Sequence, residues 1–256
     1  MKIEGAAYHQ PLILTYHSIS AGSSPLCIPP EIFAEQMEWL AREGGCVVPL
    51  AKMVDLLARK QPFPPKTVAL TFDDAFRDFY QEALPVLRRW RLPATVFVVT
   101  TRAGGTNRWP GQPAWCEQLP LMNWEEIKQV AGEGIDVGCH SRTHPALPEL
   151  DEQALREEVL TGKKELEAQI GRPVESFCYP YGSWSPPVRA LVRQHYRAAC
   201  STKMARISPD ADPHSLPRID AFYLRRPAVF QRLFSRSGSL YLGLRATLRE
   251  LRSRIG

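Results

Sequence analysis

The sequence lacks several features that would assign it to a common class. No apolar run is long enough to cross a bilayer, and the first ten residues lack the apolar core of a secretory signal. Neither GxGxxG nor GxxxxGK[ST] occurs, and there is no internal repeat. These absences favour a cytoplasmic protein without either of the two common nucleotide-binding fingerprints.

The cysteines also lack a recognisable pattern, because none of the six forms a CxxC pair. Several lie within or beside apolar runs, so buried reduced thiols are expected rather than disulfides or a cysteine-rich metal site. They are Cys27, Cys46, Cys116, Cys139, Cys178 and Cys200.

Charge divides the chain into two parts. The 256 residues, 44% of them hydrophobic, are enough for one sizeable core, and the net charge is +5. Residues 225–256 contain eight arginines and one acid, a net charge of +7, which leaves −2 for residues 1–224. We therefore predict a domain over residues 1–224 and a basic C-terminal helical extension over residues 225–256.

Short apolar runs alternate with helical patterns about seven times, which predicts an α/β fold with a parallel sheet and helical crossovers. A closed barrel is favoured over an open, doubly wound sheet. The expected strands are Leu12–Tyr16, Cys46–Leu50, Thr67–Phe72, Ala94–Thr100, Ile135–Cys139, Val174–Tyr179 and Ala198–Ser201. The segment 104–119 has no periodicity and is expected to overhang one face as a substrate-contacting loop.

Polar, reactive side chains follow four of these strands. His17 follows the first strand, Asp73 and Asp74 follow the third, and His140 follows the fifth, while residues 179–182 close the sixth. Because the carboxyl ends of parallel strands form the active face of such folds, these residues are expected to converge.

This set of side chains suits a metal-dependent hydrolase. His140 and His144 are joined by a turn rather than a helix, because Pro145 disfavours helical geometry at His144. Two imidazoles and the Asp74 carboxylate can bind zinc, cobalt, nickel or iron, and Asp73 can serve as the base for an activated water. The alternatives are surface histidines and an acidic helix start for a helix over residues 75–89.

Three segments resemble the motifs of the polysaccharide deacetylase family, also called the NodB homology domain or carbohydrate esterase family 4. They are Leu70–Ala75, Gly138–His144 and Phe177–Gly182. The resemblance extends from about Leu12 to Phe222 and implies a distorted (β/α)7 barrel in which residues 1–224 form the catalytic domain. It also implies hydrolysis of the N-acetyl group of an amino sugar, with Asp74, His140 and His144 binding a divalent metal, zinc first.

Further roles follow from the same resemblance. Asp73 would be the general base, and a backbone N–H near Tyr181 would help to hold the oxyanion. The sequence departs from the family at Cys178, where an arginine usually tethers the catalytic Asp, and no histidine follows His214 to serve as the usual acid.

The position of His17 directly after the first strand resembles the arrangement in the circularly permuted poly-N-acetylglucosamine deacetylase subgroup, in which the acid histidine comes first. That resemblance assigns His17 as the general acid; the alternative is a histidine ordered by a backbone carbonyl. Arg218 is a candidate replacement for the missing tether, with a surface ion pair as the alternative.

Several functional alternatives remain open. The substrate could be a polysaccharide, an oligosaccharide or a lipid- or nucleotide-linked precursor; a deformylase acting on a lipid-linked aminosugar and a catalytically silent carbohydrate-binding barrel are the other candidates. In the tail, leucines at helical spacing alternate with arginines, which fits either an amphipathic helix at the inner membrane surface or a terminal helix packed on the barrel. No nucleic-acid partner is expected, because no reading motif accompanies the charge.

Overall fold

Eight parallel strands form one curved sheet. The computed structural model describes residues 10–255 except 110–111 and 113–115, and the side chains of residues 252–255 also lie outside the description. The strand order is β7-β6-β5-β4-β3-β1-β8, and β2 pairs with the beginning of β3. The strands are β1 Leu12–Tyr16, β2 Cys46–Val47, β3 Thr67–Phe72, β4 Thr95–Val98, β5 Asp136–Cys139, β6 Ser176–Cys178, β7 Ala198–Cys200 and β8 Ile219–Asp220.

The two ends of the sheet meet through one short segment, residues 216–220. On one side, the backbone N–H of Leu216 donates to Ala199 O at 2.9 Å, and Ser201 N donates to Leu216 O at 2.9 Å. On the other side, β8 pairs in parallel with β1. The sheet therefore closes into a distorted barrel, as predicted.

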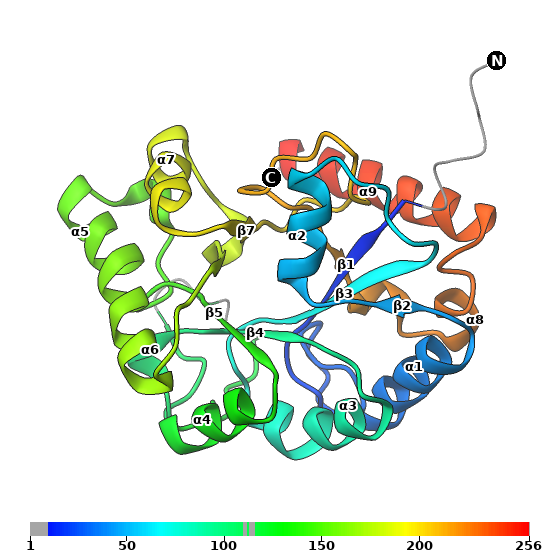
Figure 1. Ribbon diagram of the computed structural model, residues 1–256, viewed down its shortest axis with the longest axis horizontal. Helices are drawn as coiled ribbons and strands as arrows, with labels where there is room; N and C mark the ends of the chain where they lie inside the picture. Colours follow the sequence, from blue (N-terminus) through cyan, green and yellow to red (C-terminus); the bar gives the residue numbers. More distant parts are fainter. Residues whose placement is uncertain (1–9, 110–111, 113–115, 256) are drawn as a thin grey trace.

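Helices surround the strands (Figure 1). Asn123 and Glu126 form a capping box at the start of α4, and Gly171 ends α6 in the left-handed conformation. Two π-helical turns, residues 79–83 and 157–161, precede α3 and α6. The α-helices are α1 Pro30–Arg42, α2 Leu50–Ala58, α3 Leu84–Trp90, α4 Trp124–Gly132, α5 Glu152–Arg156, α6 Gly162–Ile170, α7 Pro186–His195, α8 Pro227–Phe230 and α9 Arg236–Ile255.

Several strands are shorter than expected, and three differences are larger. The expected strand Cys46–Leu50 keeps only two residues, because Leu50 already begins α2. The helix expected from Ala75 starts at Arg77, since Asp74 and Ala75 both have positive φ values, 69° and 58°. The eighth strand, β8, was not predicted, because two residues are too short to show a pattern.

The strands divide the apolar interior into two main clusters. Leu12, Leu14 and Tyr16 of β1 belong to the larger cluster, to which α1, α3, α4 and α6 contribute. Ile13 belongs to a second cluster with Phe97 of β4 and several side chains of α2. This alternation follows from the two-residue period of a strand that is covered on both faces.

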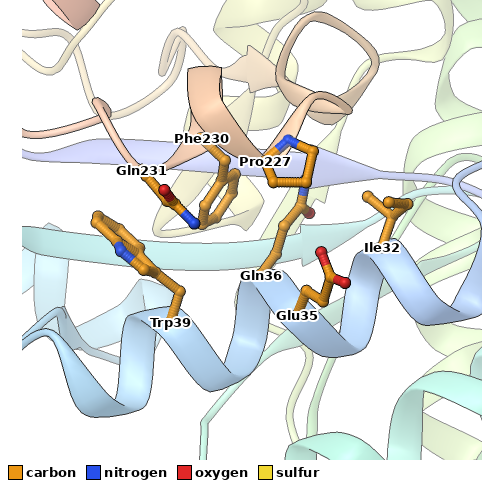
Figure 2. A pocket seen from close by; sticks show the side chains of 7 residues that line it. All are labelled: Ile32, Glu35, Gln36, Trp39, Pro227, Phe230 and Gln231. Carbon is orange, nitrogen blue, oxygen red and sulfur yellow. The ribbon is translucent and has the colours of Figure 1, made fainter.

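The C-terminal extension is anchored on α1. Figure 2 shows α1 side chains facing α8, with Trp39 beside Phe230; their ring centroids are 5.5 Å apart. Gln36 accepts a hydrogen bond from Tyr16 Oη at 2.8 Å and donates one to Leu224 O at 3.0 Å. The cavity between the two helices is only about 20 Å³. This contact is therefore packing rather than a ligand site.

The six cysteines are all free, four of them buried, as predicted. Among the described residues, no helix combines the length and the apolarity needed to cross a bilayer.

Candidate active site

One cavity of about 350 Å³ lies at the carboxyl ends of the strands. It is lined by side chains that follow β1, β3, β5 and β6. These include six of the seven predicted site residues, namely His17, Asp73, Asp74, His140, His144 and Tyr181. The seventh, Arg218, is not among the residues that line the cavity, but it contacts Asp73.

Arg218 and Asp73 form a buried, two-point ion pair. Nη1 of Arg218 lies 2.7 Å from Oδ1 of Asp73, and Nη2 lies 2.7 Å from Oδ2. Arg218 also donates to Ser201 O and Thr71 Oγ1, and Nη2 is 3.1 Å from Cys178 Sγ. The sequence alternative of a surface ion pair is therefore wrong, since Arg218 is only 1% exposed.

The ion pair sets the charge of Asp73. Burial alone would raise the pKa of this carboxyl, but the Arg218 guanidinium outweighs burial and holds the pKa below its ordinary value. Asp73 is therefore an ionised carboxylate at any physiological pH.

Asp74 faces a different set of partners from Asp73. Its φ of 69° turns the chain, so the two adjacent carboxylates do not share a direction. Oδ1 of Asp74 lies 3.4 Å from His140 Nε2 and 3.6 Å from His144 Nε2. This buried oxygen has no hydrogen-bond partner among the described residues. The alternative, in which Asp73 and Asp74 form an acidic helix start, is not seen, because the helix begins at Arg77.

Both histidines face Asp74 through Nε2. Nδ1 of His140 is 2.7 Å from Cys178 O, and because a carbonyl only accepts, Nδ1 carries the proton and a neutral ring leaves Nε2 free. Burial lowers the pKa of His144 well below the ordinary value, so this ring is neutral. Two imidazole nitrogens and a carboxylate oxygen with no protein partner are the donors expected for a divalent metal.

A second grouping of Asp73, His140 and Cys178 has similar spacing. It fits a metal less well, because Arg218 already occupies both oxygens of Asp73. Burial also raises the pKa of Cys178 well above its ordinary value, so the sulfur remains a thiol rather than a thiolate ligand.

The turn that carries the histidines is held by a buried acid, Glu158. Ser141 and His144 have positive φ values of 64° and 66°, which are unusual for these residue types. One oxygen of Glu158 accepts from Arg142 N and Thr143 N, each at 2.8 Å, and the other accepts from Thr143 Oγ1 at 2.6 Å. Sequence reasoning missed Glu158; the only signal was an acid on the apolar side of a helical pattern.

His17 completes the rim. Its Nε2 lies 3.9 Å from Oδ2 of Asp73, and its side chain is 19% exposed. The residues that follow it are fixed by Asp78, which accepts from Ser18 Oγ at 2.5 Å and from Ile19 N at 2.8 Å.

Aromatic rings bracket His144. Trp109 stacks on it with ring centroids 4.2 Å apart, and Tyr181 meets it edge-on at 4.7 Å. Gln112 and Cys116 also line the cavity, so the non-periodic segment 104–119 reaches the site as expected. Its residues 110–111 and 113–115 lie outside the described part. Tyr181 itself has a φ of 57° in a tight turn, and its oxyanion role stays a prediction.

Comparisons with known proteins agree with this geometry. A family model described as polysaccharide deacetylase matches residues 60–199. YxkH of Bacillus subtilis (strain 168), which carries a provisional polysaccharide deacetylase name, is 29% identical over 209 residues, 81% of this chain and 70% of that protein. The poly-beta-1,6-N-acetyl-D-glucosamine N-deacetylase of Staphylococcus epidermidis is 24% identical over 222 residues, 80% of this chain and 74% of that protein.

A solved structure gives the same result. IcaB from Ammonifex degensii is similar with a TM-score of 0.72 and 25% identity, over 90% of this chain and 97% of that one. Since the family model covers more than half of the residues, the chain belongs to the polysaccharide deacetylase family.

Proposed function

We propose that this protein removes the N-acetyl group from an N-acetylated amino sugar in a metal-dependent hydrolysis that releases acetate. The observation that carries the proposal is the convergence of Asp74, His140 and His144 beside a second carboxylate, Asp73, whose pKa Arg218 holds below its ordinary value. A poly- or oligosaccharide of N-acetylglucosamine is the first candidate substrate, because a relative is named for that polymer. Lipid- and nucleotide-linked precursors are further candidates.

The metal would be held by the carboxylate of Asp74 and Nε2 of the two histidines. When bound, a divalent cation supplies a Lewis acid that polarises the acetamide carbonyl and makes a water more acidic. Zinc suits this donor set first, with cobalt, nickel or iron as alternatives.

Asp73 is the proposed general base. Its Oδ2 is on the side of His17, and it accepts the proton of the water that attacks the carbonyl carbon. Arg218 acts through Asp73 as a positioning residue: the two-point contact fixes the carboxylate plane and keeps it ionised.

His17 is the proposed general acid. It donates a proton to the amine nitrogen as the carbon–nitrogen bond breaks, which yields acetate and a free amine. A backbone N–H in the turn near Tyr181 is the proposed donor to the oxyanion.

Arg218 bears on the alternative of a silent barrel. The loss of the family arginine at Cys178 was the best reason to suspect an inactive protein. The guanidinium of Arg218, from the segment before β8, contacts the Asp73 carboxylate and lies 3.1 Å from Cys178 Sγ. This replacement supports an active enzyme.

The test is a direct measurement of acetate release. Metal-loaded protein is incubated with β-1,6-linked N-acetylglucosamine oligomers and with lipid- and nucleotide-linked N-acetyl sugars, with and without a chelator. Acetate release should disappear with chelator, return on addition of zinc, and fall about 10²–10⁴-fold in Asp73→Asn with unchanged metal content.

Two outcomes would overturn the proposal. Release of formate from N-formyl sugars without acetate release would favour the deformylase alternative. No release from any of these substrates by metal-loaded protein would favour the silent barrel.

A further inference from the structure

The C-terminal helix α9 exposes a row of leucines. Among the described residues, five large apolar side chains are exposed, and four of them belong to this one helix. They are Leu240, Leu244, Leu248 and Leu251, with exposed fractions of 75%, 62%, 42% and 48%. At roughly 100° per residue these four positions fall within about 80° of arc, so they form one face of the helix.

The opposite side of α9 is the side that packs on the barrel. Leu242 is 5% exposed and belongs to the main apolar cluster. Tyr241 Oη donates to Tyr223 O at 2.9 Å, and a side chain at Gly238 would overlap the backbone of Arg232. The helix is therefore anchored with its leucine face turned outward, which a helix that only completed the core would not do.

Arginines flank the leucine face. By the same helical geometry, Arg245 follows it on one side, and Arg236 lies on the other. The guanidinium of Arg245 is 5.4 Å from the Tyr241 ring and 5.7 Å from the Tyr223 ring, which holds it at the border of the face. Across residues 225–256 only Glu250 is acidic.

We infer that α9 docks on a membrane surface rich in anionic phospholipids. Acyl chains would take the leucines while lipid phosphates contact the flanking arginines, as in helices that lie in the plane of an interface. The helix is not apolar enough to cross the bilayer.

A second copy of this chain is a poorer occupant of the same face. Pairing two copies of α9 would bring two strongly basic segments together, with Glu250 of each as the only opposing charge. Charge complementarity therefore selects an anionic partner, and the leucines select one with an apolar interior.

The test is flotation of the full-length, metal-loaded protein with vesicles. Phosphatidylglycerol–phosphatidylcholine vesicles are compared with pure phosphatidylcholine at low and high salt. The pair Leu244→Ser with Leu248→Ser keeps the charge, and the pair Arg236→Gln with Arg245→Gln keeps the leucines. The control is Arg59→Gln with Arg91→Gln, two exposed arginines on other elements.

The wild type should bind anionic vesicles, less at high salt, and each α9 pair should bind at least about tenfold more weakly, whereas the control should bind like the wild type. Wild-type protein that fails to bind, or α9 variants that bind normally, would overturn the inference. A dimer that the leucine pair abolishes would assign the face to a second copy instead. Because acetate release from soluble oligomers should be unchanged in the α9 variants, the inference and the proposed function can fail separately.

Discussion

The carboxyl-end rim of the barrel and the outer face of α9 both reverse the usual distribution of side chains. At the rim, charged groups are buried: Asp73, Asp74 and Arg218 are at most 4% exposed. On α9, leucines that would normally be inside face outward. Departures of this kind are expected where function rather than stability selects the residue.

The two regions depend on different forces. The rim depends on short, directional contacts, so the loss of one partner leaves a buried charge uncompensated. The leucine face depends on apolar area, to which each side chain adds a similar, modest amount. Single substitutions should therefore act strongly at the rim and weakly on the leucine face of α9.

The largest effect is expected from Arg218→Met, which removes the charge but keeps a long side chain. Loss of the two-point contact should lower kcat about 100-fold by misplacing the base, with metal content unchanged. Stability should fall by about 3–5 kcal/mol, because Asp73 is left buried without a partner.

The pH dependence of the same variant has a defined sign. In the wild type the pKa of Asp73 is depressed, so its stabilising contribution is present above the unfolded pKa and is lost as pH falls through the folded pKa. Without the guanidinium, burial raises the pKa of Asp73 above its unfolded value, so the variant loses stability as pH rises through the folded pKa. The acid limb of the kcat/KM profile should move to higher pH for the same reason.

Arg206→Met is the matched control for Arg218→Met. Arg206 is a partly buried arginine that donates only to the backbone carbonyls of Gln10 and Leu233. It should lower stability without moving the pH profile. If Arg218→Met also leaves the profile in place, Arg218 does not act through Asp73.

A smaller effect is expected from Glu158→Gln. The amide can accept at one position only, so the turn that carries His140 and His144 loses part of its support. Zinc affinity, measured by competition with a chromogenic chelator, should fall about 10–100-fold, and excess zinc should restore turnover.

The control is Glu157→Gln, which removes the same charge from the same helical turn. Glu157 is exposed, so its loss should not affect the turn that carries the histidines. Equal zinc affinity in all three proteins would show that Glu158 does not support the ligands.

Sequence reasoning reached the strands that carry the site because buried parallel strands have a clear apolar pattern. β1 and β3 match their predicted bounds, and the reactive residues that follow them lie together. The three motif segments lie within residues 60–199, which the family model matches, whereas His17 and Arg218 lie outside that span. His17 was indicated by its place after the first strand and by the resemblance to the permuted subgroup, and Arg218 only by its place after a short apolar stretch.

The missed features depend on tertiary structure. Glu158 contacts the turn from a π-helical segment, and Trp109 reaches His144 from a loop without periodicity. Neither contact has a local pattern, because both join residues more than ten positions apart. The direction of the leucines on α9 was also open, since helical spacing defines a face but not which face is buried.

The smallest effect is expected on the leucine face of α9. Leu242→Ala should lower the free energy of unfolding by about 2–5 kcal/mol, because it leaves a cavity in the packed side. Leu244→Ala, two residues away on the same helix, should change it by less than about 0.5 kcal/mol. Urea unfolding followed by circular dichroism compares the two directly, and helix propensity cancels because both changes are identical. A large, concentration-dependent loss in Leu244→Ala would mean that the leucines are already covered by a second copy, since destabilisation through an interface, unlike a cavity, depends on how much protein is present.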